Sequence, residues 1–207
     1  MNQRSKYKHA LIFLYVPIYL IAFFLLEQRT GVSYHIIHSP IDDWIPFEEV
    51  FVIPYLIWFP YLLGGFAYLF YKSFSPKGKQ KFLIMAWQLI AGMSFCLLTY
   101  FIWPNGLNLR PEVYPRDNLL TDLCALLQGV DTPTNVCPSI HVYSTLVIHR
   151  AVCHSGLGKK RWIVITSCVI AILICLSTMF IKQHSIGDVI AAIILFVVSC
   201  LIFKYKK

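Results

Sequence analysis

Long apolar stretches without charged residues alternate with short polar segments along the chain. Three of them, residues 50–71, 82–103 and 162–181, reach the length of about 20 residues that a helix needs to cross a bilayer. Residues 10–26 have the same character, and residues 186–203 carry a single charge near their start. The pattern therefore predicts membrane-spanning helices over all five stretches.

A sixth candidate, residues 138–153, is less apolar because His141, His149 and Arg150 interrupt it. Such a segment suits a membrane helix only if its polar end lines a site inside a bundle. The first apolar stretch follows a basic leader but ends without a small-residue cleavage site, so we expect a retained span and not a signal peptide. We predict an all-α integral membrane protein with a single domain, residues 1–207, built as a six-transmembrane-helix bundle.

The composition agrees with this fold class. The chain has 57% hydrophobic and only 14% charged residues, with a mean hydropathy of +0.64, which is too apolar for a water-soluble domain of 207 residues.

Charged residues divide between alternate loops. Fourteen of the 18 basic residues lie in four segments on one side of the predicted spans: Arg4, Lys6, Lys8, Lys72, Lys77, Lys79, Lys81, Arg150, Lys159, Lys160, Arg161, Lys204, Lys206 and Lys207. All ten acidic residues lie in the other segments. Since Lys and Arg concentrate in cytoplasmic loops, both termini are predicted to be cytoplasmic. The net charge of +8 then reflects an anionic inner leaflet, and no nucleic-acid partner is expected.

Two long polar segments, residues 27–49 and 104–137, fall on the opposite, extracytoplasmic side. Within the second, the apolar residues 119–127 predict a short helix along the membrane surface. The segment ends at Pro138, which suits the first turn of a helix. The backbone N–H groups of residues 139–141 are therefore expected to face outward as an anion site.

Six polar side chains from three regions of the sequence gather at this outer level: Arg110, Ser139, His141, Lys182, His184 and Asp188. We expect His184 and Asp188 to open the last helix, where residues four apart share a face. A carboxylate in that place can accept a hydrogen bond from one ring nitrogen and leave the other free to attack, which activates a histidine nucleophile. No His, Cys, Asp or Glu set has the spacing of a metal site, so neither a metal nor another cofactor is expected.

Together these residues resemble the type-2 phosphatidic acid phosphatase superfamily of membrane lipid phosphatases and phosphotransferases. Its three motifs occur in order: Arg-Pro at residues 110–111, Pro-Ser-x-His at residues 138–141, and a Ser-to-His-x-x-x-Asp pattern over residues 177–188. Each fragment is weak alone, but order, spacing and shared sidedness make the combination specific. The resemblance covers most of the chain and implies the same six-helix fold.

By this resemblance, His184 attacks phosphorus and forms a phosphohistidine, Asp188 orients it, and His141 protonates the departing lipid oxygen. An alkoxide leaves poorly unless protonated, and imidazole can supply the proton near neutral pH. The implied phosphate ligands are Arg110, Lys182 and Ser139. The expected activity is metal-independent hydrolysis of a lipid phosphate or pyrophosphate, such as phosphatidic acid, phosphatidylglycerophosphate or polyprenyl pyrophosphate. The active site would face outward from the membrane, which in the bacterial proteins of this kind is the plasma membrane.

Two positions depart from the family pattern: Trp103 replaces a Lys of the first motif, and Thr178 replaces an Arg of the third. A site with fewer cations holds a dianionic phosphomonoester less tightly, whereas a singly charged phosphodiester loses less. The Lys-Gln pair before His184 also resembles the branch of inositol phosphorylceramide synthases. A lipid phosphotransferase of that type, which passes a phospho-headgroup to a lipid alcohol, stays open as an alternative. A proton-coupled transporter is more distant, because the second, third and fifth predicted spans contain no charge to continue a path.

The division of charges predicts how single cysteines react in sealed cells. Lys79→Cys and Lys159→Cys should be shielded from a membrane-impermeant thiol reagent, whereas Asp43→Cys and Asp117→Cys should react with it. Each variant is compared with the parent protein, whose own cysteines give the background. Reversed labelling would contradict the outward-facing site.

Overall fold

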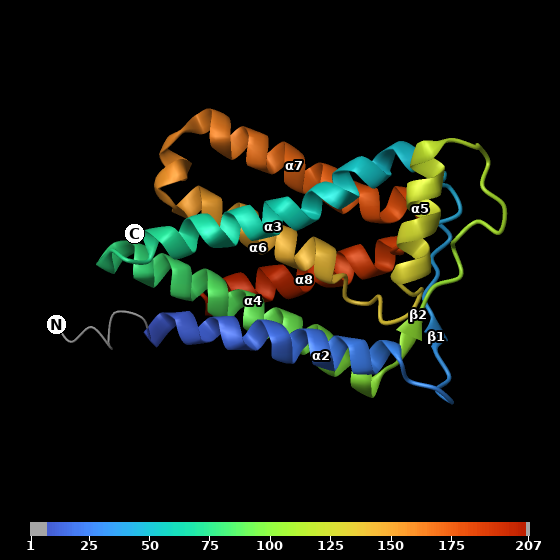
Figure 1. The fold of residues 1–207 in the computed structure, drawn as a ribbon, viewed down its shortest axis with the longest axis horizontal. Coiled ribbons are helices and arrows are strands. Elements are labelled where there is room, and N and C mark those ends of the chain that lie inside the picture. The colour runs from blue at the N-terminus through green and yellow to red at the C-terminus, as the bar shows by residue number, and fades with distance from the viewer. Residues whose placement is uncertain (1–7, 206–207) are drawn as a thin grey trace.

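The computed structural model describes residues 8–205, which are mostly helical. In chain order the elements are η1 (Lys8–Leu14), α2 (Tyr15–Glu27), β1 (His35–Ile36), η2 (Glu49–Phe51), α3 (Val52–Lys72), α4 (Pro76–Ile102), β2 (Asn105–Gly106), α5 (Leu119–Val130), α6 (Ile140–His154), η3 (Gly156–Lys159), α7 (Arg161–Phe180) and α8 (Ile186–Ile202). Helices α2, α3, α4, α6, α7 and α8 lie side by side, and α5 lies crosswise at one end of the bundle (Figure 1). We call this the α5 end, and the opposite one the turn end, because the α3–α4 and α6–α7 turns lie there.

Four helical segments are long and apolar enough to cross a membrane: Ala10–Glu27, Glu49–Lys72, Pro76–Ile102 and Arg161–Phe180. The chain is thus an all-α protein of the membrane-associated class. Helices α6 and α8, with 15 and 17 residues, are shorter than the roughly 20 residues of a full crossing. The predicted number of six spans is therefore not confirmed.

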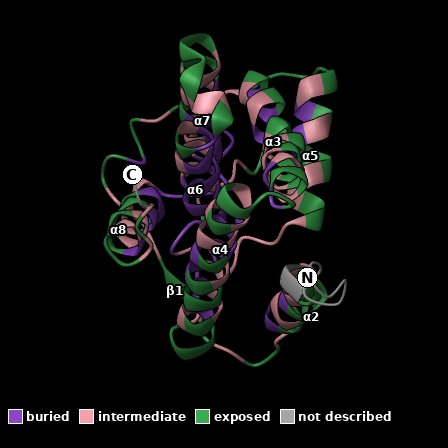
Figure 2. Cartoon of the chain, turned by 90° about the vertical axis from the view of Figure 1, so that its left-hand side faces the viewer, coloured by how far each residue is buried: buried purple, intermediate pink, exposed green. Residues whose placement is uncertain are grey.

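Helix α6 forms the centre of the bundle. It contacts α3, α4, α7 and α8, and most of its residues are buried, whereas the outer helices show exposed faces (Figure 2). A central helix is covered by protein and not by lipid, so it can carry polar residues that an outer helix could not. This position explains why the sixth candidate is the least apolar one.

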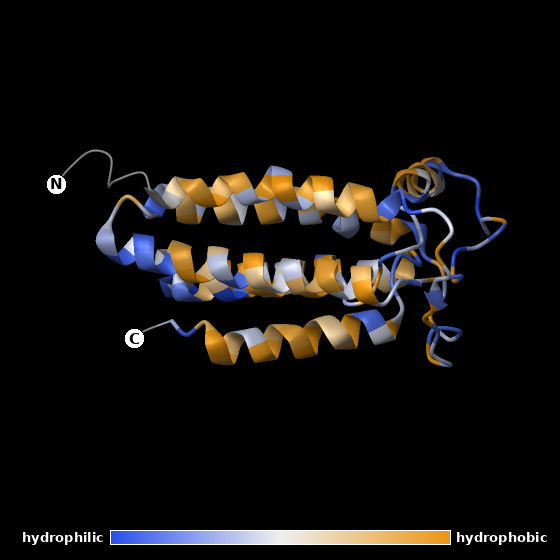
Figure 3. Cartoon of the chain, turned by 90° about the horizontal axis from the view of Figure 1, so that it is seen from below, coloured by the Kyte–Doolittle hydropathy of each residue, from blue (hydrophilic) through white to orange (hydrophobic). Residues whose placement is uncertain are grey.

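Polar residues concentrate at the two ends of the bundle, with apolar residues between them (Figure 3). At the turn end, Arg150 of α6 donates to Gln88 Oε1 of α4 and to the carbonyl of Phe203, each at 2.6 Å. Gln88 in turn donates to Ser199 of α8 at 2.7 Å. These bonds join three helices around a guanidinium group. The basic residues Arg4, Lys6, Lys206 and Lys207 lie outside the described residues.

At the α5 end, three loop segments are joined by backbone pairing. Strands β1 and β2 pair in parallel, with His35 opposite Asn105, and Gly106 forms an antiparallel bridge with Thr134. The Asn105 side chain is fully buried; its Oδ1 accepts the N–H groups of Val136 and Cys137 at 2.9 and 2.8 Å. The segment that leads into α6 is therefore fixed by the segment that follows α4.

Helix α5 confirms the short helix predicted at residues 119–127. Asn118 caps its start by accepting the N–H groups of Leu120 and Thr121 at 2.9 and 3.1 Å. Its apolar residues Leu119, Leu126 and Val130 are exposed, as expected for a helix along a membrane surface.

The packing of α6 against α4 predicts a strong effect of one methyl group. A Cβ at Gly92 would lie 2.0 Å from the ring of Tyr143, which is fully buried. Gly92→Ala should therefore lower the free energy of unfolding by about 1–3 kcal/mol, as overpacking does. Thermal unfolding in detergent micelles measures this. The control is Gly64→Ala, where nothing lies within 4 Å and helix propensity alone favours alanine. An equal loss in both variants would contradict the close packing of α4 and α6.

Candidate active site

The connection between α7 and α8 turns sharply and presents Gln183 and His184 to the bundle. The N–H groups of Lys182 and Gln183 donate to the carbonyls of Met179 and Thr178 at 3.0 and 2.9 Å, the pattern of a Schellman motif. Lys182 occupies the left-handed position with φ of +57°, where glycine is usual. His184 N–H also donates to the Thr178 carbonyl, at 2.9 Å. The end of α7 thus fixes the backbone of both residues.

The start of α8 brings Asp188 back onto His184. Ser185 caps the helix, and Asp188 Oδ2 accepts the Ser185 N–H at 2.9 Å, which completes a capping box. The same oxygen lies 3.3 Å from Nδ1 of His184. His184 therefore precedes the cap and is not part of the helix, contrary to the expectation that it opens it. The predicted contact with Asp188 forms nevertheless, because the carboxylate reaches back over the cap.

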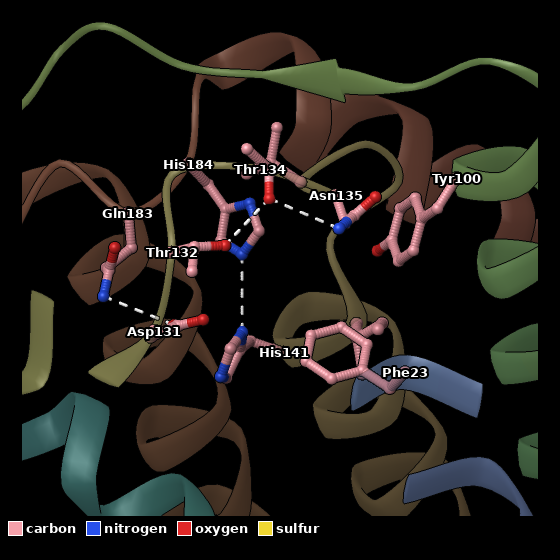
Figure 4. A pocket seen from close by; sticks show the side chains of 11 residues that line it. Phe23, Tyr100, Asp131, Thr132, Thr134, Asn135, His141, Gln183 and His184 are labelled. Atoms are coloured by element: carbon pink, nitrogen blue, oxygen red, sulfur yellow. Dashed lines mark hydrogen bonds between the residues drawn. The ribbon is translucent and has the colours of Figure 1, made fainter. Parts of the chain in front are cut away.

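The second ring nitrogen of His184 faces another histidine. Its Nε2 lies 3.3 Å from Nδ1 of His141, which occupies the first turn of α6 (Figure 4). With an ionised Asp188 accepting from Nδ1–H, the lone pair of neutral His184 is on Nε2. The arrangement thus directs a nucleophilic nitrogen toward a second group that can carry a proton.

Aromatic residues of α3 hold the ring of His141. The ring centroids of Tyr55 and Trp58 lie 4.7 and 4.5 Å from that of His141. The Tyr55 hydroxyl lies 2.9 Å from His141 Nε2, and the Trp58 indole N–H donates to Ser144 at 2.9 Å. Two aromatic rings and the hydroxyl group at Nε2 are therefore fixed neighbours of this imidazole.

Arg110 does not contact the two histidines itself, but it binds Gln183, the residue next to His184. Its Nη2 donates to Gln183 Oε1 and, at 2.6 Å, to the carbonyl of Asp131; its Nη1 donates to the carbonyl of Gln128 at 2.8 Å. Gln183 Nε2 donates to Asp131 Oδ2 at 3.3 Å. Burial lowers the pKa of Arg110, and the nearby Asp131 opposes this shift. Arg110 thus positions Gln183, the neighbour of His184.

Lys182 points away from the two histidines. Its ammonium donates to the carbonyls of Asp42 and Ile45, and the residue is 9% exposed. Burial lowers the pKa of Lys182, whereas Asp42 and Asp43 raise it. A role in phosphate binding stays a prediction for this residue; in this geometry it anchors the loop before α3.

Asp42 is a buried partner of the same region that the sequence did not single out. Its Oδ2 accepts the Ser39 N–H at 2.8 Å and the Ser185 hydroxyl at 2.6 Å, and its Oδ1 accepts the Ile186 N–H at 2.8 Å. Asp42 therefore caps α8 from a loop more than 140 residues earlier in the chain. The start of α8 is held by two carboxylates.

Ser139 acts as the N-cap of α6. Its hydroxyl accepts the Val142 N–H at 3.3 Å, and its own N–H donates to the Asp188 carbonyl at 3.3 Å. Within the described part of the chain, the N–H groups of Ile140 and His141 have no such partner. Two of the three N–H groups expected to form an anion site are thus free for one.

A small cavity that is open to solvent lies in front of the histidine pair (Figure 4). The connection between α5 and α6 supplies its polar wall, formed by Asp131, Thr132, Thr134 and Asn135. Glu27, at the end of α2, holds this wall by accepting from Asn135 Nδ2 at 2.6 Å and from the Thr132 hydroxyl. Phe23 and Tyr100 form the apolar edge. Such a lining suits a ligand with a small polar group, which would face the polar wall, and an apolar chain, which would lie along the apolar edge.

The sequence thus identified His141, His184 and Asp188, which the structure brings together. It missed Tyr55, because aromatic residues are common near the ends of membrane spans. It also missed Asp131 and Asp42, which had been counted only as external charges. The one available signal was the presence of these acids close to apolar spans, where acidic residues are rare unless they are paired or functional.

Comparisons of the chain with protein-family models, with curated proteins and with solved structures found no match. The resemblance to the type-2 phosphatidic acid phosphatase superfamily therefore stays a prediction that rests on the motifs.

The capping of α8 by Asp42 predicts unequal effects at two adjacent acids. Asp42→Asn replaces an acceptor oxygen by an amide that faces a donor, so the free energy of unfolding should fall by about 1–3 kcal/mol. Asp43→Asn is the matched control: its side chain is 60% exposed and pairs with exposed His38, so a change within about 0.5 kcal/mol is expected. Thermal unfolding in micelles compares the two. Equal stabilities would show that Asp42 does not hold the start of α8.

Proposed function

We propose that the chain is an integral membrane phosphoric-ester hydrolase that acts on a lipid phosphate or pyrophosphate through a phosphohistidine on His184. One observation carries the proposal: Nε2 of His184 faces Nδ1 of His141 at 3.3 Å, while Asp188 occupies its other nitrogen. A nucleophile, its orienting carboxylate and a second acid-base group thus meet at one cavity.

The proposed topology has six crossings, with the α5 end outside the cell. Its support is the arrangement of α6 and α8 beside the four long apolar helices (Figure 1). The two ends of the bundle are polar (Figure 3), and the sequence separates the basic turns from the acidic loops between them. The two short helices cross because their neighbours and the polar loops cover their ends. A lipid headgroup at the outer surface then lies level with the cavity.

In the first half-reaction the lone pair of His184 Nε2 attacks phosphorus, and the bond from phosphorus to the lipid oxygen breaks. His141 gives that oxygen a proton from Nδ1, without which an alkoxide leaves poorly. Asp188 keeps the proton of His184 on Nδ1 and stabilises the positive charge that develops on this ring. The N–H groups of Ile140 and His141 stabilise the phosphoryl oxygens at the start of α6.

In the second half-reaction water attacks the phosphohistidine. His141, now with a lone pair on Nδ1, takes the proton of the water, and the bond between phosphorus and His184 Nε2 breaks. Inorganic phosphate is released and both histidines return to their first state. Histidine supplies both the nucleophile and the proton, so the proposed chemistry needs no metal ion.

Transfer of a phospho-headgroup to a lipid alcohol is the second candidate, and the cations of the site favour it. Both Arg110 Nη atoms bind protein oxygens, and Lys182 is turned away from the histidines. The cavity wall instead includes the carboxyl group of Asp131. In such a site a dianionic phosphomonoester is bound less favourably than a singly charged phosphodiester.

Two substitutions test the division of labour between the histidines. His184→Ala should reduce turnover to the background rate, because no other group replaces the nucleophile. His141→Ala should lose about 10²–10⁴-fold with an alkyl ester, the usual contribution of a general acid. The matched control is His149→Ala, on the same helix but at the turn end, where Nδ1 bonds to Ser167 at 2.9 Å; it should retain activity. A near-normal rate in His184→Ala would refute the nucleophile assignment.

The choice between the two candidates is made by a substrate panel. Purified protein is incubated with phosphatidic acid, phosphatidylglycerophosphate and polyprenyl pyrophosphate, and inorganic phosphate is measured. Parallel reactions contain a phosphodiester lipid with and without a lipid alcohol. Phosphate release from the first group supports the hydrolase. Headgroup transfer without phosphate release would replace it by the transferase.

A further inference from the structure

His141 has a second partner that the proposed mechanism does not use. While its Nδ1 faces His184, its Nε2 lies 2.9 Å from the hydroxyl of Tyr55, which in turn lies 3.1 Å from Oδ2 of Asp131. Tyr55 is 1% exposed and belongs to α3, whereas Asp131 directly follows α5. Three elements thus form one row of hydrogen-bonding groups behind the imidazole.

When His141 is neutral, the protons of this row have two arrangements in which both contacts are hydrogen bonds. A tyrosine hydroxyl has one proton to donate. If it donates to an ionised Asp131, then Nε2 of neutral His141 carries the ring proton and Nδ1 is a lone pair. If it donates to Nε2, a protonated Asp131 donates to the Tyr55 oxygen, and Nδ1 carries the ring proton. The second arrangement places an N–H where the leaving oxygen needs one, and the first places a base where water needs one.

The surroundings of Asp131 allow it to change between these states. Burial raises the pKa of its carboxyl group, which favours the protonated form. Groups from the neighbouring elements oppose this shift in the pKa of Asp131: the electrostatic interaction with the His184 ring, the hydroxyl of Tyr55 and the charge of Arg110. Gln183 Nε2 lies 3.3 Å from Asp131 Oδ2, the oxygen that the Tyr55 hydroxyl also contacts. Asp131 is therefore neither fully exposed to water nor committed to a salt bridge.

We propose that Asp131 and Tyr55 form a proton relay that supplies and recovers the proton used by His141, a role that rests on the function proposed above. As the bond between phosphorus and the lipid oxygen breaks, that oxygen takes the Nδ1 proton of His141. Nε2 takes the proton of Tyr55, and Tyr55 takes the proton of Asp131, which becomes a carboxylate. His141 remains neutral throughout, which avoids placing an imidazolium in a buried site.

The second half-reaction returns the protons. The water oxygen bonds to phosphorus, the bond to His184 Nε2 breaks, and the electron pair stays on that nitrogen. The water proton moves to Nδ1 of His141, while the Nε2 proton passes to Tyr55 and the Tyr55 proton to Asp131. Tyr55 and Asp131 act on the leaving oxygen and on the water through His141, and are therefore positioning residues in this relay.

If the relay operates, the fall in rate when it is interrupted should depend on the leaving group. Tyr55→Phe and Asp131→Asn interrupt the row with little change of shape. With enzyme in excess, the first-turnover release of diacylglycerol from phosphatidic acid should fall by about 10- to 100-fold, because the alkoxide needs the proton. Release of nitrophenol from nitrophenyl phosphate in the same detergent should change by less than about threefold, since this leaving group departs without one. A purely structural role would slow both reactions equally.

Tyr143→Phe is the matched control. Tyr143 is also buried, and its hydroxyl donates to the Gln88 carbonyl at 2.6 Å, away from the histidines. It should leave the ratio of the two rates as in the parent protein. Equal losses with both substrates in Tyr55→Phe and Asp131→Asn, or no loss with either, would overturn the relay while the proposed function stands. If the parent protein releases neither product, the proposed function fails and the relay fails with it.

Discussion

The position of the start of α8 is the constraint on which the site depends. Two buried carboxylates, Asp42 and Asp188, accept the N–H and hydroxyl groups of Ser185 and the N–H of Ile186. A buried donor without a partner costs about 1–3 kcal/mol, so these bonds favour one position of the helix end. His184 directly precedes Ser185. Its ring is therefore held against Asp188 and within reach of His141 before any substrate arrives.

The α5 end of the bundle is held mainly by polar contacts between loops. Asn105 binds the backbone before α6, Glu27 binds the cavity wall, and Lys182 binds the loop before α3. Lys182, a cation that could have bound a phosphate, is thus occupied by the protein itself. The histidine pair and the start of α6 lie at the cavity, and the N–H groups of Ile140 and His141 have no hydrogen-bond partner within the described residues. This favours chemistry driven by proton transfer and nucleophilic attack over chemistry driven by a cluster of cations.

The sequence predicted the elements whose signal is local, and missed those that depend on contacts between distant segments. The helix predicted at residues 162–181 occurs as Arg161–Phe180, because an uncharged run of that length has few alternatives in lipid. The contact of His184 with Asp188 was predicted from a shared helix face, but it forms because Asp188 reaches back over the Ser185 cap. The hydrogen bonds of Tyr55, by contrast, join it to residues 76 and 86 positions away. The direction of Lys182 depends on a positive φ that no local pattern indicates for a lysine.

The most direct measurement is the position of the covalent phosphate. Protein is mixed with a lipid phosphate labelled in its phosphoryl group, quenched in base within one turnover, digested, and its peptides are sequenced by mass spectrometry. A phosphoramidate is stable in base and labile in acid, so a phosphohistidine survives this treatment. Asp188 and His141 flank His184 so that its Nε2 alone carries the free lone pair. We expect acid-labile phosphate on His184 and on no other residue. Turnover with the label on another residue, or a labelled protein in the His184→Ala variant, would contradict His184 as the nucleophile.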